Sequence, residues 1–294
     1  MRILRAGPSL VLVLAGVSFL PPPGHAQERI DRGQAVASDA RFKIWAPAGS
    51  VRMEAWDRDS LHIAGTVEHG KLYSGGGRDA MKVMVEDLAG TNLSPTAHLV
   101  IQVPRGAQVS VKTVTAPIEA TAVTGWFNSI SGDIRLGGTA RRLEAETLDG
   151  SITLQAEATW VRVRTGSGAI TLEGRYRDLR TSSVSGPIRV LNKEVERGRI
   201  ESVTGDIHYA GRFMPEGAVD FDTHSGTVTL ELPNNVAGHL SLTSIGGSIE
   251  NNLTADQPAP AVEGAGEELV LRLGGGGAAI TVRSFKGTIR LVRM

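Results

Sequence analysis

The residues whose types and spacing best fit a chemical site are Asp220, Asp222 and His224. Carboxylate and imidazole groups are ligands for divalent metals. Alternate residues of a strand share one face, and the apolar Phe221 belongs to the inner face, so the two carboxylates point to solvent. His224 takes a position that related segments fill with Ile, Leu or Val. We interpret the cluster as an outward acidic strand, and we predict no metal and no cofactor.

A second candidate for chemistry is a row of serine and threonine hydroxyls, because a hydroxyl beside a base can act as a nucleophile. These hydroxyls recur in one motif: Ser or Thr, two residues, Gly, any residue, then Ile or Val. The nine copies are Thr113, Ser129, Thr147, Thr165, Ser183, Ser202, Thr223, Ser244 and Ser284. Nine equivalent copies argue against one nucleophile. They predict a stacked ladder in which each hydroxyl donates to one neighbour and accepts from another.

The composition excludes several other classes of site. The 294 residues contain no cysteine, which excludes disulfides, thiolate zinc sites, cysteine nucleophiles and lipid anchors on cysteine. Lys+Arg and Asp+Glu number 31 each, whereas a general nucleic-acid binder needs a basic excess to neutralise phosphates. We therefore predict no nucleic-acid partner. The 36 glycines have no three-residue period, which excludes collagen.

The motif glycines define a repeat. They are Gly132, Gly150, Gly168, Gly186, Gly205, Gly226, Gly247 and Gly287, preceded by a degenerate copy with Ala116. Apolar residues alternate on both sides of each glycine, as in Leu143 and Ala145 before Gly150 and Ile152 and Leu154 after it. A period of two predicts strands with one buried face. Each unit of 18 to 21 residues is thus expected to hold two short strands and two turns.

Such a unit cannot bury its apolar face alone, but a stack of equivalent units can. We therefore predict an all-β protein, a parallel β-solenoid (β-helix) of two-strand coils. A sandwich of hairpins would also give short alternating strands, but it does not explain why the same residue types return at the same offset eight times. The glycine at the corner would serve either a positive φ or a close approach of the chain.

Both ends of the array are irregular. We expect a flexible segment over residues 27–40 and a solenoid domain over 41–294, beginning with a first coil over 42–53. The insertion over 57–108 predicts antiparallel hairpins that cover the N-terminal end of the solenoid and protect its edge. The polar stretch over 251–266 predicts a surface loop, followed by one irregular coil.

The first 26 residues have the three-part pattern of a secretory signal peptide. Arg2 and Arg5 precede an apolar run over 10–20, and cleavage is predicted after Ala26. The alternative is a membrane anchor, but this run is shorter than the roughly 20 apolar residues that a span requires. No later segment is apolar enough to span a bilayer. We expect a mature chain without a transmembrane segment, located in the periplasm, on the cell surface or outside the cell.

The repeat varies in length mostly where a coil's second strand connects to the next coil. In a solenoid such insertions emerge along one edge, which is often the binding side. Basic and aromatic residues gather there: Arg141, Arg142, Trp160, Arg175, Tyr176, Arg177, Lys193, Arg197 and Arg212. This edge could bind an anionic partner with salt-dependent affinity. The alternative is a solvated edge that nearby acidic residues partly neutralise.

Three segments, in order, resemble the bacterial putative-adhesin family of β-strand-repeat proteins, an exported group otherwise described as a domain of unknown function. They are residues 49–59, residues 99–104 and the Ser-Gly-Asp-Ile type of repeat, which ends at 284–291. The resemblance implies a β-solenoid of the surface or envelope and no catalytic residues. Its partner could be a surface glycan, anionic lipid head groups or another surface protein.

The function that these observations predict is an exported, non-enzymatic β-solenoid that serves as an adhesin-like interaction or structural module of the envelope. The alternative is a β-helix lyase or hydrolase of polysaccharides, which would use paired carboxylates on an outer face. Outward charges such as Glu144 beside Arg162 serve more simply as cross-strand pairs. A cluster of Asp and Glu in a concave groove would favour the enzyme.

Overall fold

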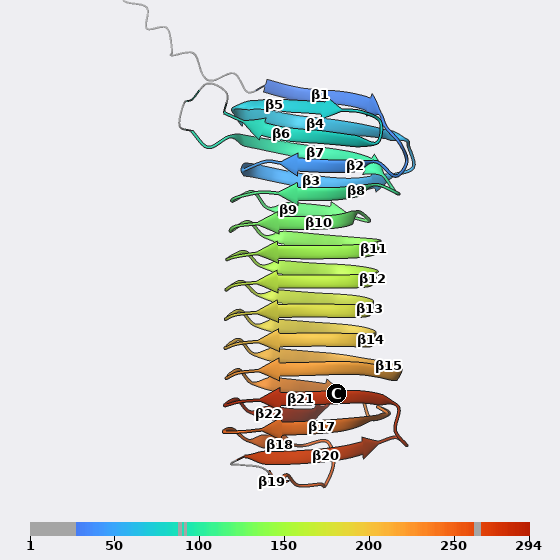
Figure 1. Ribbon diagram of the computed structural model, residues 1–294, viewed down its shortest axis with the longest axis vertical. Helices are drawn as coiled ribbons and strands as arrows, with labels where there is room; N and C mark the ends of the chain where they lie inside the picture. Colours follow the sequence, from blue (N-terminus) through green and yellow to red (C-terminus); the bar gives the residue numbers. More distant parts are fainter. Residues whose placement is uncertain (1–27, 88–89, 91–92, 262–265) are drawn as a thin grey trace, which may run out of the picture.

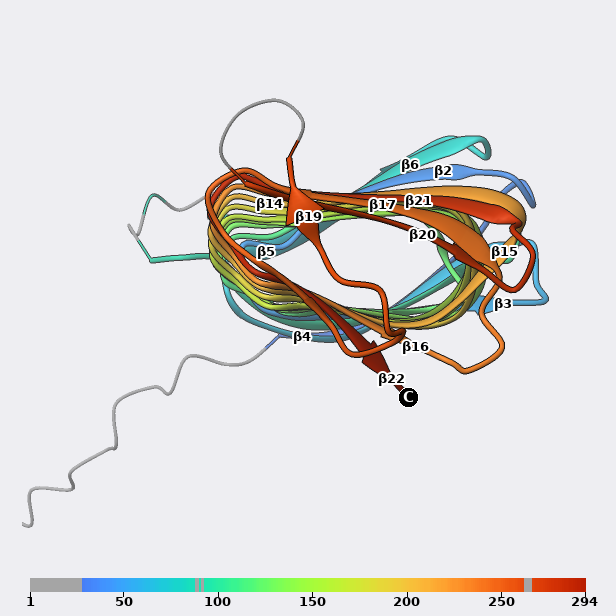
Figure 2. The same ribbon diagram turned by 90° about the horizontal axis from the view of Figure 1, so that it is seen from below.

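A computed structural model describes residues 28–87, 90, 93–261 and 266–294, and within them the backbone of 192–193 without its side chains. All regular elements in this part of the chain are strands, which stack into a straight rod (Figure 1). Viewed along the rod, successive coils superimpose as a flattened oval (Figure 2). The protein is a parallel β-solenoid, as the repeat predicts. The predicted signal peptide, residues 1–26, lies outside the described residues.

The middle of the rod consists of five strands that pair in parallel and in sequence order. They are β11 (Ile134–Thr147), β12 (Ile152–Thr165), β13 (Ile170–Ser183), β14 (Ile188–Ser202) and β15 (Ile207–Thr223). Each joins the strand predicted after one motif glycine to the strand predicted before the next without a break, so the expectation of two turns per unit is wrong at one of them. The connection between the two predicted strands is a bend within one long strand, and its residues continue the parallel hydrogen-bonded pairing with the neighbouring coils. The register shifts only where that length changes, as at Val195.

The core is a set of aliphatic columns along the rod. Ile152, Ile170 and Ile188 occupy one register position and are 0–1% exposed, as the alternation predicts. Each coil places its side chain directly on that of the coil before. Branched residues suit these positions because they pack well on a pleated surface.

The true turn of each coil, which we call the corner, contains the motif glycine. None of the repeated glycines has a positive φ. A β-carbon on Gly150 would instead collide with the main-chain carbonyl of Gly132 in the neighbouring coil, and the same holds for Gly168 against Gly150. Of the two reasons that the sequence left open for this glycine, close approach of the chain is the one that applies.

The corner hydroxyls bond mainly to backbone, which corrects the predicted ladder. The amide of Gly150 donates to Thr147 Oγ1 at 3.1 Å, and equivalent bonds of 2.8–3.1 Å form in four other corners. Thr147 Oγ1 then donates to the carbonyl of Ile130 in the neighbouring coil (3.2 Å). Among the described hydroxyls of this row, Thr113 and Ser129 alone bond directly to each other (2.9 Å). The glycine amide is the nearer partner because it lies within the same turn.

The N-terminal end carries a cap of antiparallel strands, as predicted, but with two differences. Residues 28–35, expected to be flexible, form β1 (Glu28–Ala35), which pairs with β4 (Ser60–His69). The insertion over 57–108 is also more than hairpins. Besides β4 and β5 (Lys71–Gly76), it contains β6 (Ala80–Glu86) and β7 (Thr96–Pro104), which add a further parallel coil.

This added coil lies outside the first coil of the chain. The first coil, β2 (Arg41–Trp45) and β3 (Ala48–Trp56), is sandwiched between β6 and β7 on one side and β8 (Gln108–Lys112) and β9 (Ile118–Thr121) on the other. The rod then continues through β10 (Thr124–Ser129) into β11. The first coil in the sequence therefore lies one coil inside the end of the rod.

The C-terminal end has the same arrangement. Strands β16 (Val228–Leu232), β17 (Gly238–Ser244) and β18 (Ile249–Asn251) precede the last coil, β21 (Ala278–Ser284) and β22 (Ile289–Arg293). That last coil is inserted between β15 with β16 and β17 with β18. The short β19 (Ala259–Pro260) and β20 (Glu267–Leu273) form the antiparallel cap. The loop predicted over 251–266 thus contains β19, and its residues 262–265 lie outside the described part.

Candidate functional site

An exposed apolar stripe runs along the corners of the rod. The residue after the corner hydroxyl points outward, because the hydroxyl before it is buried and so is the glycine two residues later, except Gly247, which is half-buried. From Ile130 onward, in spatial order, these residues are Ile130, Leu148, Gly166, Val184, Val203, His224, Phe285 and Ile245. We call them the corner stripe. Its large aliphatic members are 46–58% exposed from Ile130 to Ile245, which is high for residues of this type.

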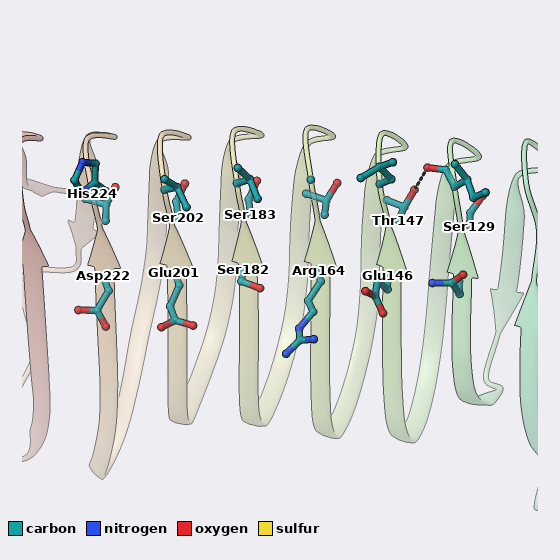
Figure 3. A pocket seen from close by; sticks show the side chains of 18 of the residues that line it. Ser129, Glu146, Thr147, Arg164, Ser182, Ser183, Glu201, Ser202, Asp222 and His224 are labelled. Atoms are coloured by element: carbon teal, nitrogen blue, oxygen red, sulfur yellow. Dashed lines mark hydrogen bonds between the residues drawn. The ribbon is translucent and has the colours of Figure 1, made fainter.

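The corner stripe forms one wall of a groove of about 1090 Å³. The facing wall consists of outward polar residues, one from each coil, which directly precede the corner hydroxyls (Figure 3). In the groove they are, in spatial order, Asn128, Glu146, Arg164, Ser182, Glu201 and Asp222, and Arg283 and Thr243 continue the row beyond the groove. We call them the polar row. The groove is thus apolar on one side and charged or polar on the other, over several coils.

The polar row is only partly paired. Arg283 donates two hydrogen bonds to Asp222 (2.7 and 3.2 Å), and Arg199 donates to Glu201 (2.8 Å). The hydrogen bond with Asp222 raises the pKa of Arg283. Within the described residues, Glu146 and Arg164 form no ion pair although they occupy neighbouring coils. The charged groups of these two side chains face the groove, where a partner could contact them.

The cluster of Asp220, Asp222 and His224 has structural partners. Asp222 is bound by Arg283, and the His224 ring stacks on Phe285 with ring centres 4.9 Å apart. In the part of the chain that the structure describes, no group of three or more His, Cys, Asp or Glu could hold a metal.

The predicted basic edge lies at the bends, on the opposite side of the oval from the corners. Several of its cations are paired: Arg175 with Glu194 (3.7 Å), Arg177 with Glu196 (2.6 Å) and Arg197 with Glu196 (3.3 Å). These ion pairs agree with the alternative of a solvated edge that nearby acidic residues partly neutralise.

Neither of the aromatic residues predicted for this edge is fully exposed. Tyr176 is fully buried, and its hydroxyl donates to the carbonyl of Glu173 (2.9 Å), which corrects its assignment to a binding surface. Burial raises the pKa of its phenol. The guanidinium of Arg142 covers the ring of Trp160 at 4.0 Å.

The remaining cations of the edge are Arg141, Arg212 and Lys193. Arg141 and Arg212 are exposed, and neither forms an ion pair with another described residue. Arg141 lines a small pocket of about 340 Å³ together with Arg105. The side chain of Lys193 lies outside the described part. The bends therefore bring together fewer available cations than their sequence indicates.

Residues 54–271 match the family described as Toastrack DUF4097. The chain belongs to the Toastrack DUF4097 family. This family is a domain of unknown function, and its identification agrees with the resemblance drawn from the repeats. No curated protein matches the chain.

Solved structures with the same architecture include two from Parabacteroides distasonis. One is described as a putative lipid binding protein, with 12% identity, a TM-score of 0.55, and coverage of 90% of this chain and 96% of the other. The second is described as a putative adhesin, with 14% identity, a TM-score of 0.51, and coverage of 91% and 98%. At these identities the likeness shows the Toastrack fold alone.

The corner stripe of this Toastrack chain was missed by the sequence reasoning. The signal was present, since the residue after the motif hydroxyl is Ile, Leu, Val or Phe in most copies. Those residues lie at a turn, where strand alternation does not say which way a side chain points. Only the structure, in which the preceding hydroxyl and most of the following motif glycines are buried, shows that the apolar residue points outward.

Among the described residues of this Toastrack chain, there is no helix long and apolar enough to cross a bilayer.

Proposed function

We propose that this Toastrack protein is an exported, non-enzymatic interaction module of the cell envelope or surface, which contacts its partner through the corner stripe. The observation that carries the proposal is the stripe itself. Apolar side chains that are about half exposed recur along the rod, beside a groove of about 1090 Å³. Contiguous exposed apolar surface on a soluble domain marks an interaction site. The signal-peptide pattern of residues 1–26 supports export, and relatives in fold described as putative adhesins support a surface role.

Two neighbouring carboxylates of the groove are held by arginine side chains. Glu201 and Asp222 lie in neighbouring coils, where an acid and a base of a polysaccharide-acting enzyme could stand. Arginine side chains occupy oxygens of both carboxylates at 2.7–2.8 Å. These contacts give both carboxylates a role as ion-pair partners within the fold. We therefore retain the non-enzymatic function and treat the enzyme as the alternative.

The proposal is tested with the full chain expressed in a bacterial host. N-terminal sequencing of the exported protein should find a start after Ala26. Beads coated with the purified protein should bind intact cells or the envelope fraction, and Leu148→Glu should reduce that binding. Val270→Glu is the matched control, because Val270 is 75% exposed but lies on the cap, away from the stripe. Equal binding by wild type and Leu148→Glu would contradict the proposal, as would release of new sugar ends from polysaccharides.

A further inference from the structure

The proposed function leaves the partner of the corner stripe unnamed, and the following inference rests on that function. We infer that the partner is a second copy of this chain, packed antiparallel along the first with the two corner stripes in contact. The inference comes from the spacing of the stripe, the order of its side chains and the order of charges in the polar row.

The spacing of the stripe selects a partner with the same period. Stripe residues recur once per coil, at the interstrand distance of about 4.8 Å. Side chains on one face of an extended peptide recur about every 6.7 Å, and a helix turn rises 5.4 Å, so both lose register within a few coils. Another copy of the rod has the same period throughout. It can keep every apolar side chain in contact along the whole stripe.

The order of side chains fits an antiparallel pair. A two-fold axis perpendicular to both rods, placed between the coils of Val184 and Val203, makes the contact self-complementary. The facing pairs are then Val184 with Val203, Leu148 with Phe285, Ile130 with Ile245 and Gly166 with His224. Gly166, the stripe position without a side chain, thus faces the imidazole ring of His224, and this ring fills the gap. A parallel pair would instead place Gly166 on Gly166 and His224 on His224.

The polar row fixes the same register independently. An axis perpendicular to the rods brings the two polar rows to one side of the contact. In the register above, Arg164 faces Asp222 and Glu146 faces Arg283. Arg164 and Glu146 are the two row charges that lack an ion pair within the described chain, whereas Asp222 and Arg283 are bound to each other. The pair would therefore join four charges of alternating sign, twice per dimer.

Other registers bring like charges together. A slip of one coil in one direction places Glu146 against Asp222, and a slip in the other places Arg164 against Arg283. A slip of two coils places Glu201 against Glu146 or against Asp222. Like charges across an interface are strongly unfavourable, so the order of charges in the polar row disfavours these shifted registers. The apolar order and the charge order thus select the same arrangement.

The size of the contact indicates a reversible dimer. Eight coils span about 38 Å, but the contact is only two side chains wide, so the buried area is small. This area is at the low end for specific protein pairs. We expect monomer and dimer to exchange at micromolar concentrations.

Cysteine crosslinking tests the arrangement directly, because the chain has no cysteine of its own. Ile130→Cys and Ile245→Cys place thiols at the two far ends of the stripe, at positions that are 48% and 50% exposed. A mixture of the two variants should form disulfide-linked dimers on mild oxidation, and each variant alone should form none. Crosslinking of Ile130→Cys with itself would show a parallel pair and overturn the inference.

Sedimentation of the unmodified protein over a range of concentrations separates this inference from the proposed function. We expect a monomer–dimer equilibrium, a Kd raised at least about 100-fold by Leu148→Glu, and no change with Val270→Glu. A wild-type protein that stays monomeric would overturn the inference, while loss of envelope binding by Leu148→Glu would still support the proposed function. A dimer that Leu148→Glu dissociates without loss of envelope binding would support the inference and contradict the proposed function.

Discussion

Gly287 packs directly on Gly226 at the corner of the rod, although an entire coil separates the two residues in the sequence. That intervening coil carries Gly247, which packs on Gly287 from the other side. The last strands of the chain are therefore interior strands of the solenoid. The cap formed by β20 covers the end in their place. The N-terminal end is organised in the same way around β2 and β3.

Ile289 should behave as a core residue although it lies five residues from the end of the sequence. Chain termini usually tolerate substitution, but Ile289 is fully buried between two coils. We expect Ile289→Ala to lower the free energy of unfolding by about 2–5 kcal/mol. Val292→Ala, in the same strand but half-exposed, should cost less than about 1 kcal/mol. Urea denaturation measures both, and equal small effects would show that the last coil is not inserted.

The corner glycines should resist the smallest side chain. A β-carbon at Gly168 would collide with the carbonyl carbon and oxygen of Gly150, and backbone cannot move aside as a side chain can. We expect Gly168→Ala to cost about 3 kcal/mol or more. Gly137→Ala is the control, since its β-carbon would meet no atom closer than 3.7 Å. Thermal unfolding of the two variants decides the point, and similar melting temperatures would mean that the coils separate more easily than their packing indicates.

The repeat predicted the fold because its information is periodic. Apolar alternation about each motif glycine identifies the inner face, and recurrence at a fixed offset identifies the stack. The order of coils at the ends could not be predicted in this way. The coil of Gly287 and the coil of Gly247 carry the same motif, so either could stack on the coil of Gly226. The motif alone therefore does not predict which of the two coils does so. The choice depends on the lengths of the cap strands and loops.

The candidate site was predictable only in part, for a similar reason. Sequence identifies which residues are charged, but not which charges find partners across the bends. Arg177 and Glu196 come from neighbouring coils whose lengths differ, and their ion pair depends on how the bend accommodates that difference. An aromatic residue such as Tyr176 is of a type suited to binding, but the bend encloses its ring and buries it.

The basic edge should contribute little to the binding of anions. We expect wild type and a variant carrying Arg141→Ser, Arg142→Ser, Arg175→Ser and Arg177→Ser to bind acidic polysaccharide and anionic liposomes alike, at low and at high salt. Three of these four arginines already have an acidic neighbour, and the fourth is a single exposed charge. A clear loss of low-salt binding in the variant would instead establish the edge as an anion site.

The two buried tyrosines should make the protein sensitive to alkali. Burial raises the pKa of Tyr176 and of Tyr209 above the ordinary tyrosine value of about 10, because the phenolate is costly to desolvate. Their hydroxyls also donate to the carbonyls of Glu173 and Arg212, and these bonds need the proton. Above a pH of about 10 the unfolded chain loses these two protons while the folded chain keeps them, so the stability that they contribute is full below that pH and falls as the pH rises toward the folded pKa.

We therefore expect the free energy of unfolding to decrease by up to about 1.4 kcal/mol per pH unit for each of these tyrosines above a pH of about 10. Urea denaturation at a series of alkaline pH values measures that slope. Tyr176→Phe should lower the stability at neutral pH, because the ring keeps its packing but the carbonyl of Glu173 loses its donor. The substitution should also reduce the fall of the free energy of unfolding with alkaline pH by the contribution of one tyrosine. Phenolate absorbance tests the cause, since Tyr176 and Tyr209 should ionise together with unfolding. Ionisation of either phenol in protein that remains folded would contradict the argument, because it would mean that water reaches the ring within the intact coil.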